Sequence, residues 1–157
     1  METGFNNKHI ISIIFLLITL TSCQAAPPPS PITASINDEF ILRPSQSAAI
    51  LSTDLTLNLI AITSDERCPL EIECAMSGPV SLTISILSAE NGPAEFALQT
   101  FTDNDGRAPA MSFEGIQNRM GFEGYTIHVK AVLPYPLKRS GEIKDSDYQV
   151  SFVVTSK

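Results

Sequence analysis

The chain of 157 residues contains only two histidines, His9 and His128, and three cysteines. Bases are also scarce: 10 Lys and Arg stand against 17 Asp and Glu, which gives a formal net charge of −7. The few lysines and arginines form no cluster. Because an acidic surface repels the phosphate backbone, this composition argues against a nucleic-acid partner.

Catalytic motifs are absent as well. The sequence has no Gly-x-Ser-x-Gly elbow, no Ser-x-x-Lys, no His-Glu-x-x-His and no glycine-rich phosphate loop. His128 alternates with Thr126 and Lys130, so it is expected on the solvent face of a strand, with no nearby acid or cysteine to orient it as a base. We therefore expect a protein that is not an enzyme and needs no cofactor.

The apolar run Ile10–Leu20 is too short to cross a bilayer, which requires about 20 residues. It follows a polar start and suits the hydrophobic region of an export signal. The four residues that end it, Leu-Thr-Ser-Cys at 20–23, resemble a bacterial lipobox. The resemblance implies cleavage of a signal peptide at 1–22 and a lipid on Cys23. The alternative is an ordinary secretory signal cut near Ala25, which would release a soluble protein.

A lipid on Cys23 would determine where the protein works. Each buried CH₂ contributes ~0.8 kcal/mol, so two or more acyl chains hold a protein firmly at the membrane. Gln24, and not Asp, follows the cysteine. By resemblance to lipoprotein sorting rules, this implies the outer membrane if the host has two membranes. We expect an exported, lipid-anchored domain that faces the periplasm or the exterior.

The other two cysteines, Cys68 and Cys74, are separated by five residues. In an exported chain such a pair indicates a structural disulfide. Two thiolates alone do not complete a tetrahedral zinc shell, and a redox-active pair usually has two intervening residues. Closing so short a loop is worth about 2–2.5 kcal/mol on the chain-entropy estimate.

Composition divides the rest of the chain into two parts. Residues 23–38 contain four prolines among small residues and are predicted to form an extended, flexible linker after the lipidated cysteine. Residues 39–157 are predicted to form one domain. The strongest period there is two, which is typical of half-buried antiparallel strands. The clearest alternating segments are 55–59, 80–86, 125–131 and 148–154, and shorter candidates are Phe40–Arg43, Ala48–Leu51 and Glu95–Phe101.

About seven strands without a helical stripe predict an all-β, antiparallel two-sheet sandwich, with immunoglobulin-like topology as one option. Tyr125 could then form a tyrosine corner, or it could simply pack at a sheet edge. The long segment Thr102–Glu123 fits less well. It is expected either to contain a short strand near Met111–Phe113 or to cap the open end of the sandwich, with its apolar residues plugging the core.

Four acids are weak calcium candidates, because calcium takes six to eight oxygen ligands. Asp65 and Glu66 precede the cysteine pair, and Asp103 and Asp105 share a turn. The glycine of that turn does not stand at the sixth position that an EF-hand loop requires, so a plain hairpin turn is the simpler interpretation. Arg67 is expected to neutralise Glu66 or Asp65.

The segment Asp65-Glu66-Arg67-Cys68-Pro69, followed by Cys74 and Gly78, resembles a group of small bacterial lipoproteins and secreted domains. Their core has Asp-Ser-Arg-Cys-Pro with five residues between the cysteines. The Phe40–Ala48 segment and the stretch from Gly124 to Pro136 fit the same group. The chain departs at Glu66, where serine is usual, and at Met76, where tryptophan is expected. The resemblance implies a fold and a location, and no activity.

Two classes of function remain. The first is a non-catalytic, membrane-anchored lipoprotein whose loops or sheet edge bind a protein or glycan partner, or support the envelope. The alternative is a module that binds calcium or a small ligand.

Overall fold

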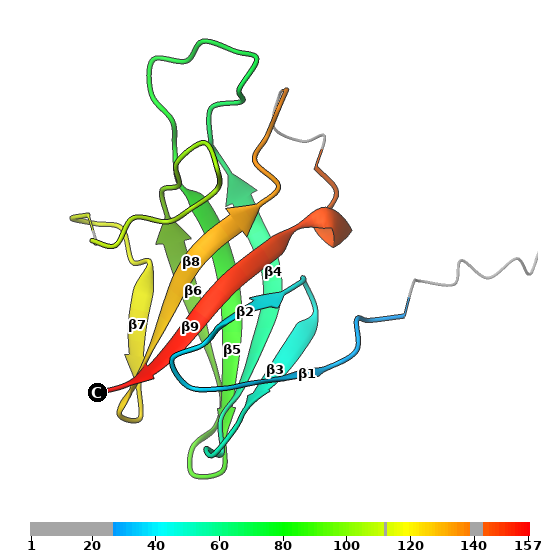
Figure 1. Cartoon of the computed structure of the whole chain (residues 1–157), viewed down its shortest axis with the longest axis vertical. Coiled ribbons are helices and arrows are strands. Elements are labelled where there is room, and N and C mark those ends of the chain that lie inside the picture. The colour runs from blue at the N-terminus through cyan, green and yellow to red at the C-terminus, as the bar shows by residue number, and fades with distance from the viewer. Residues whose placement is uncertain (1–26, 112, 139–142) are drawn as a thin grey trace, which may run out of the picture.

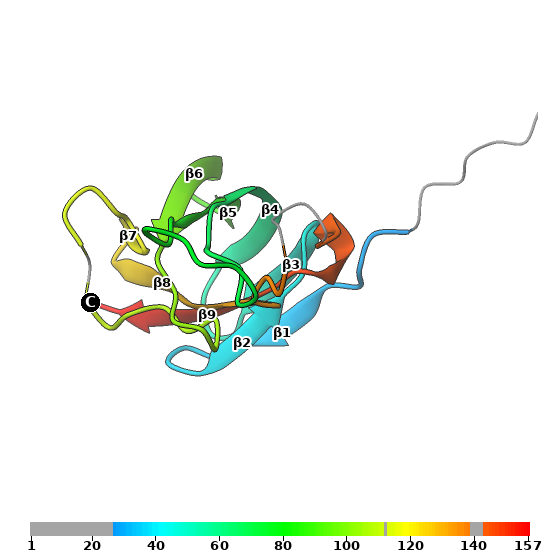
Figure 2. The same cartoon turned by 90° about the horizontal axis from the view of Figure 1, so that it is seen from above.

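The structure is a computed structural model that describes residues 27–111, 113–138 and 143–157 (Figures 1 and 2). The predicted signal peptide and Cys23 lie outside these residues. Two facing sheets form an all-β sandwich, as the alternation predicts. The described elements are β1 (Ile32–Ala34), β2 (Glu39–Leu42), β3 (Gln46–Ile50), β4 (Thr56–Asp65), β5 (Val80–Ser88), β6 (Gly92–Thr100), β7 (Arg119–Phe122), β8 (Tyr125–Leu133), the 3₁₀ helix η1 (Asp145–Asp147) and β9 (Gln149–Ser156).

One sheet has the strand order β1-β3-β4-β5-β6 and the other has the order β2-β9-β8-β7. All described pairs are antiparallel except β1 with β3, which is parallel. Strands β3 to β6 form a meander within one sheet. An immunoglobulin domain distributes consecutive strands over both sheets, so its topology is not the one observed.

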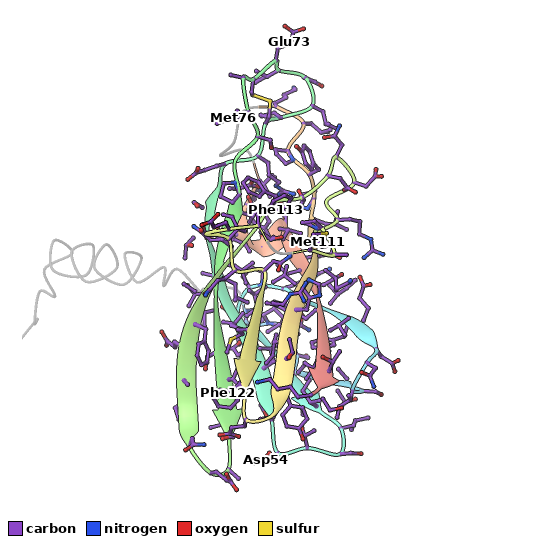
Figure 3. The ribbon with its side chains drawn as sticks, turned by 90° about the vertical axis from the view of Figure 1, so that its left-hand side faces the viewer. Asp54, Glu73, Met76, Met111, Phe113 and Phe122 are labelled. Atoms are coloured by element: carbon purple, nitrogen blue, oxygen red, sulfur yellow. A yellow bond between two sulfur atoms is a disulfide. The ribbon has the colours of Figure 1, made fainter. Side chains whose placement is uncertain are left out.

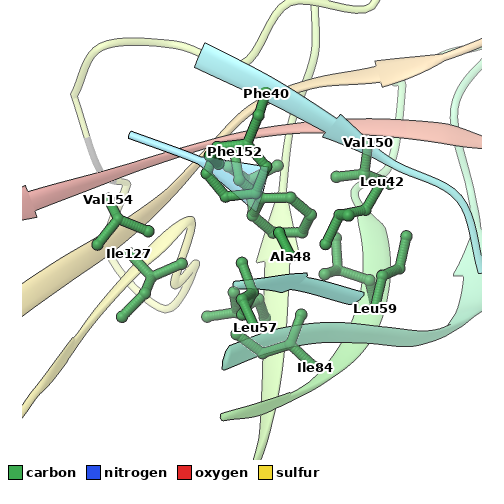
Figure 4. Close-up of a cluster of buried hydrophobic side chains, with 14 of the residues drawn as sticks. Phe40, Leu42, Ala48, Leu57, Leu59, Ile84, Ile127, Val150, Phe152 and Val154 are labelled. Carbon is green, nitrogen blue, oxygen red and sulfur yellow. The ribbon is translucent and has the colours of Figure 1, made fainter. Parts of the chain in front are cut away.

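Side chains from the two inner faces interdigitate to form the core (Figure 4). Leu57, Leu59 and Ile84 contribute from one sheet, and Val150 and Phe152 from the other; all are almost fully buried. The Phe152 ring lies 6.2 Å from that of Phe40, centroid to centroid. Burying one such side chain is worth about 1.5–3 kcal/mol, so these alternating positions dominate the stability of the sandwich.

Strand β4 has two register shifts, and each one reverses the face of the sheet to which the following side chains point. They lie between Leu59 and Ala61 and between Ile62 and Ser64. Directly opposed residues of antiparallel strands share a face, and Asp65 is paired with the buried Val80. The two shifts cancel each other in the alternation, so Asp65 faces the inside of the sandwich, as Leu57 and Leu59 do.

A third register shift lies in β8, between Val129 and Ala131. Beyond it, Ala131 is paired with Ser151 and Val132 with Val150. The sequence pattern predicts that Ala131 faces the core, but Val132 takes that position because the extra residue at the bulge reverses the alternation.

The domain begins earlier than the predicted boundary at residue 39. Within the predicted linker, Ile32–Ala34 forms β1 and pairs with β3, and the Gln46 side chain donates to the Ser30 carbonyl at 2.8 Å. Ile32, Ala34 and Ile36 pack on the core. The linker prediction was wrong for these residues because the preceding prolines masked a short alternating strand.

Segment Thr102–Glu123 contains a strand, but not at the predicted place. Met111 and Phe113 are exposed and lie outside any strand, whereas Met120 and Phe122 belong to β7 and pack against the core. The expectation that the apolar residues plug the core is thus correct for β7 and wrong for the loop before it. Tyr125 is half-buried on the core, and its hydroxyl has no hydrogen bond within the described residues, so no tyrosine corner forms.

Candidate functional site

Two loops meet at one end of the sandwich, where the chain passes from β4 to β5 and from β8 to β9 (Figure 1). The amides of Leu70 and Glu71 donate to the carbonyls of Pro136 and Leu137 at 3.1 and 3.0 Å. The predicted disulfide between Cys68 and Cys74 closes the first loop, with the two Cα atoms 5.9 Å apart. The loops are thus tied within themselves and to each other.

Arg67 holds these loops to the sandwich from inside. Its side chain is fully buried and makes a bidentate ion pair with Asp65, from Nε to Oδ1 at 2.8 Å and from Nη2 to Oδ2 at 2.6 Å. Nη1 donates to the carbonyl of Val132 on β8 (2.8 Å), and Nη2 also donates to the carbonyl of Pro134, just beyond β8 (2.9 Å). A buried charge needs a partner of this kind, because an unpaired one is very costly.

Two tyrosines complete the network around Arg67. The Arg67 guanidinium lies 4.9 Å from the centroid of the Tyr135 ring, and the Tyr135 hydroxyl donates to the Cys68 carbonyl at 3.0 Å. Tyr148, the residue before β9, donates a hydrogen bond from its hydroxyl to Asp65 Oδ2 at 3.1 Å. The network therefore connects β4, both loops and the start of β9.

The network shifts two pKa values. Burial by itself would raise the pKa of Asp65, but the hydrogen bonds and positive charge of Arg67 outweigh it, so the Asp65 pKa is lowered. For Tyr148, burial and the neighbouring Asp65 charge raise the pKa to about 12. Both groups keep their structural protonation state throughout the neutral range, which is typical of a scaffold and not of an acid–base pair.

Four large apolar side chains on these two loops are exposed, and we call this set the apolar tip: Leu70 (49% exposed), Ile72 (39%), Met76 (86%) and Leu137 (60%). Glu66, Glu71 and Glu73 are exposed on the same loop as the first three. Figure 3 shows Glu73 and Met76 at the far end of the molecule, opposite Asp54. This end of the sandwich thus exposes both apolar and acidic side chains.

The four calcium candidates are not brought together. Asp65 is committed to Arg67 and Tyr148, and Glu66 is exposed. Asp103 Oδ1 accepts the amides of Asp105 (3.0 Å) and Arg107 (2.8 Å), which is the hydrogen bonding of a capped turn. Across the residues that the structure describes, no three His, Cys, Asp or Glu side chains gather closely enough to hold a metal ion.

His128 is less hydrated than the sequence predicts. It is half-buried on the outer face of β8, and its Nε2 atom is covered without a hydrogen-bond partner among the described residues. Burial, together with the charges of Lys130 and Arg119, lowers its pKa to about 4. The ring is therefore neutral at neutral pH.

Reasoning from sequence found part of this site. It identified the disulfide and the Asp65–Arg67 pair, with Glu66 left as an alternative partner. It missed Tyr135 and Tyr148, whose hydroxyls reach Cys68 and Asp65 from 67 and 83 residues along the chain. The only sequence feature that pointed to either tyrosine was the Pro134-Tyr135-Pro136 segment, which contains Tyr135.

Comparisons with known proteins add no relative. The chain matches no protein-family model, no curated protein and no solved structure. The described part of the chain also contains no helix that is long and apolar enough to span a membrane.

Proposed function

We propose that this protein is a lipid-anchored, non-catalytic binding module that holds a partner protein through the apolar tip. The observation that carries the proposal is the combination of exposure and support at this end of the sandwich. Met76 and Leu137 are largely exposed, yet the loops beneath them are held by a disulfide, two loop-to-loop hydrogen bonds and the buried Arg67. Apolar side chains presented on a rigid support are typical of interaction surfaces.

The charge of the tip favours a partner protein with a basic rim around an apolar pocket. Glu71 and Glu73 are exposed and flank Leu70 and Ile72 in the sequence of the loop, so they would pair with lysines or arginines of the partner. The same acids oppose insertion into an anionic membrane surface. We therefore expect a protein as the occupant, and not the bilayer that holds the anchor.

The chain enters the domain at a position that leaves the apolar tip accessible. Residues 27–31 leave the side of the sandwich near β1 and not the end that carries the tip (Figure 1). A lipid on Cys23 would then tether the domain from the side and leave the loops free for a partner.

The proposal is tested by crosslinking and then by measured affinity. A photo-crosslinking residue replaces Met76 in the full chain, and partners captured in native envelopes are identified and purified. Binding of the purified partner is measured for wild type, Met76→Ser and Leu137→Ser. We expect each variant to weaken binding by about tenfold. Truncating an apolar side chain that is desolvated in the complex costs about 1 kcal/mol or more of binding free energy.

Leu87→Ser is the matched control, since Leu87 is 47% exposed but lies on β5. It is expected to bind as wild type does. Equal affinity of Leu87→Ser and both tip variants would overturn the assignment. Added salt should slow association through the acidic rim. Capture of a second copy of this chain, or of lipid alone, would also count against the proposal.

A further inference from the structure

A groove of about 720 Å³ lies on the outer face of the β4-β5-β6 sheet, away from the core. Its floor contains a row of three polar side chains that face one another across the strands. Ser64 is paired with Ser81, and Ser81 with Gln99. The Gln99 side chain donates to Ser81 Oγ at 3.0 Å, which orients the row.

The wall of the groove is the loop that leads into β7, residues 113–119. The backbone amide of Gln99 donates to the backbone carbonyl of Gln117 at 3.0 Å, which fixes this loop along the edge of β6. Phe113 packs edge-on against Phe101 at 5.6 Å, and Arg119 Nη2 donates to the Ala110 carbonyl at 2.6 Å. The wall is therefore preorganised before any ligand binds.

The lining chemistry selects the ligand. Hydroxyls and amides line the groove together with the half-exposed Phe113, and Arg119 is the one charged residue among the described residues that line it. A cation would find no carboxylate there, and a ligand rich in phosphate would find a single positive charge. A fully apolar ligand would take the polar floor out of water without offering it hydrogen bonds. Hydroxyl-rich rings with one apolar face satisfy both the floor and Phe113.

We propose that this groove binds a short oligosaccharide, with the Ser64–Ser81–Gln99 row contacting its hydroxyls, Phe113 packing on a ring face and Arg119 pairing with a sugar carboxylate where one is present. The volume lies within the range of about 300–1,000 Å³ found for small-ligand sites. This site is separate from the apolar tip and does not depend on the partner protein proposed above.

The test is an NMR titration of the full chain in detergent micelles. The probes are chitotriose, cellotriose and an acidic amino-sugar oligosaccharide that carries a lactyl carboxylate. We expect shifts at the Ser64, Ser81 and Gln99 amides with at least one probe. The double variant S81A/Q99L should weaken that binding about tenfold, because it removes the hydrogen bonds that both side chains offer to the sugar hydroxyls.

Two further variants make the result specific. S85A lies on the same outer face of β5 and should bind within about twofold of wild type. R119Q should reduce binding of the acidic probe more than that of the neutral probes, which separates an acidic glycan from a neutral one. No amide shift with any probe, or equal binding by S81A/Q99L in a folded protein, would refute the groove and leave the partner-protein proposal standing.

Discussion

Arg67 is the residue whose burial most constrains the end of the sandwich that carries the tip. It carries a full charge, has 2% of its surface exposed and contacts two carbonyls, a carboxylate and an aromatic ring. The fold explains the residue order Asp-x-Arg-Cys-Pro in the sequence. The aspartate and arginine form the buried pair, and the cysteine that follows at once closes the loop above it.

Arg67→Met should destabilise the fold by about 3–5 kcal/mol, because it leaves the Asp65 carboxylate buried without a cation. Because the Asp65 pKa is lowered in the folded protein, the ion pair stabilises the fold above the pKa of an unfolded aspartate. This stabilisation is lost as pH falls through the lowered value. Urea unfolding at neutral pH measures the loss.

The double variant Asp65→Leu with Arg67→Met removes both charges and should recover much of that stability. Glu66→Gln, at the exposed neighbour, should change stability by less than about 0.5 kcal/mol. A single Arg67→Met variant as stable as wild type would contradict the role assigned to the pair.

His128 should make stability depend on pH in the acidic range. Its folded pKa of about 4 lies below the ordinary value of 6.5, so the unfolded chain takes up the proton first between these values. Stability should therefore fall as pH drops from 6.5 towards 4. The contribution should be about 1–2 kcal/mol, since partial hydration of the ring reduces the effect of the full shift.

The measurement is urea unfolding of wild type and His128→Gln at pH 7 and pH 4.5. The variant should lose less stability between the two conditions, because glutamine does not titrate. An identical loss in both proteins would show that the ring is freely hydrated.

At the scale of elements, the two β4 register shifts connect the sheet to the site. The strand starts with Leu57 and Leu59 in the core and ends with Asp65 facing inward. The two shifts cancel each other in the alternation, and together they bring Asp65 opposite Val80. Sequence alternation predicts the first half of β4. It does not predict that Asp65 lies opposite Val80, because the position of a bulge depends on pairing with β5 and not on β4 alone.

Replacing both Cys68 and Cys74 by serine should cost about 2–2.5 kcal/mol and leave the sandwich folded. The disulfide closes only the loop, whereas Arg67 and the loop-to-loop bonds act independently of it. Denaturant unfolding gives the energy, and hydrogen exchange at the Leu70 and Glu71 amides should quicken. Reduced wild type is the control and should behave like the variant. Unchanged exchange at both amides would contradict a stapled loop.

At the scale of the whole molecule, the proposed arrangement joins a lipid on Cys23 to a rigid domain through the residues before Ser30. Cys23→Ser should abolish incorporation of labelled palmitate and release the protein from the membrane fraction or leave it as uncut precursor. Cys68→Ser, which retains Cys23, is the control and should still be labelled. A Cys23→Ser protein that is cut normally and still fractionates with lipid would overturn the anchor.

The sequence by itself determined the period of two, the all-β class and the disulfide, because each depends on residues close together in the chain. Only the tertiary structure decided the strand order, the pairing of Asp65 with Val80 and the groove on the outer sheet face. These depend on register between strands that are far apart in sequence, and a shift of one residue there moves every side chain to the opposite face. The same distance along the chain explains why only the fold brings Tyr135 to Arg67 and Tyr148 to Asp65.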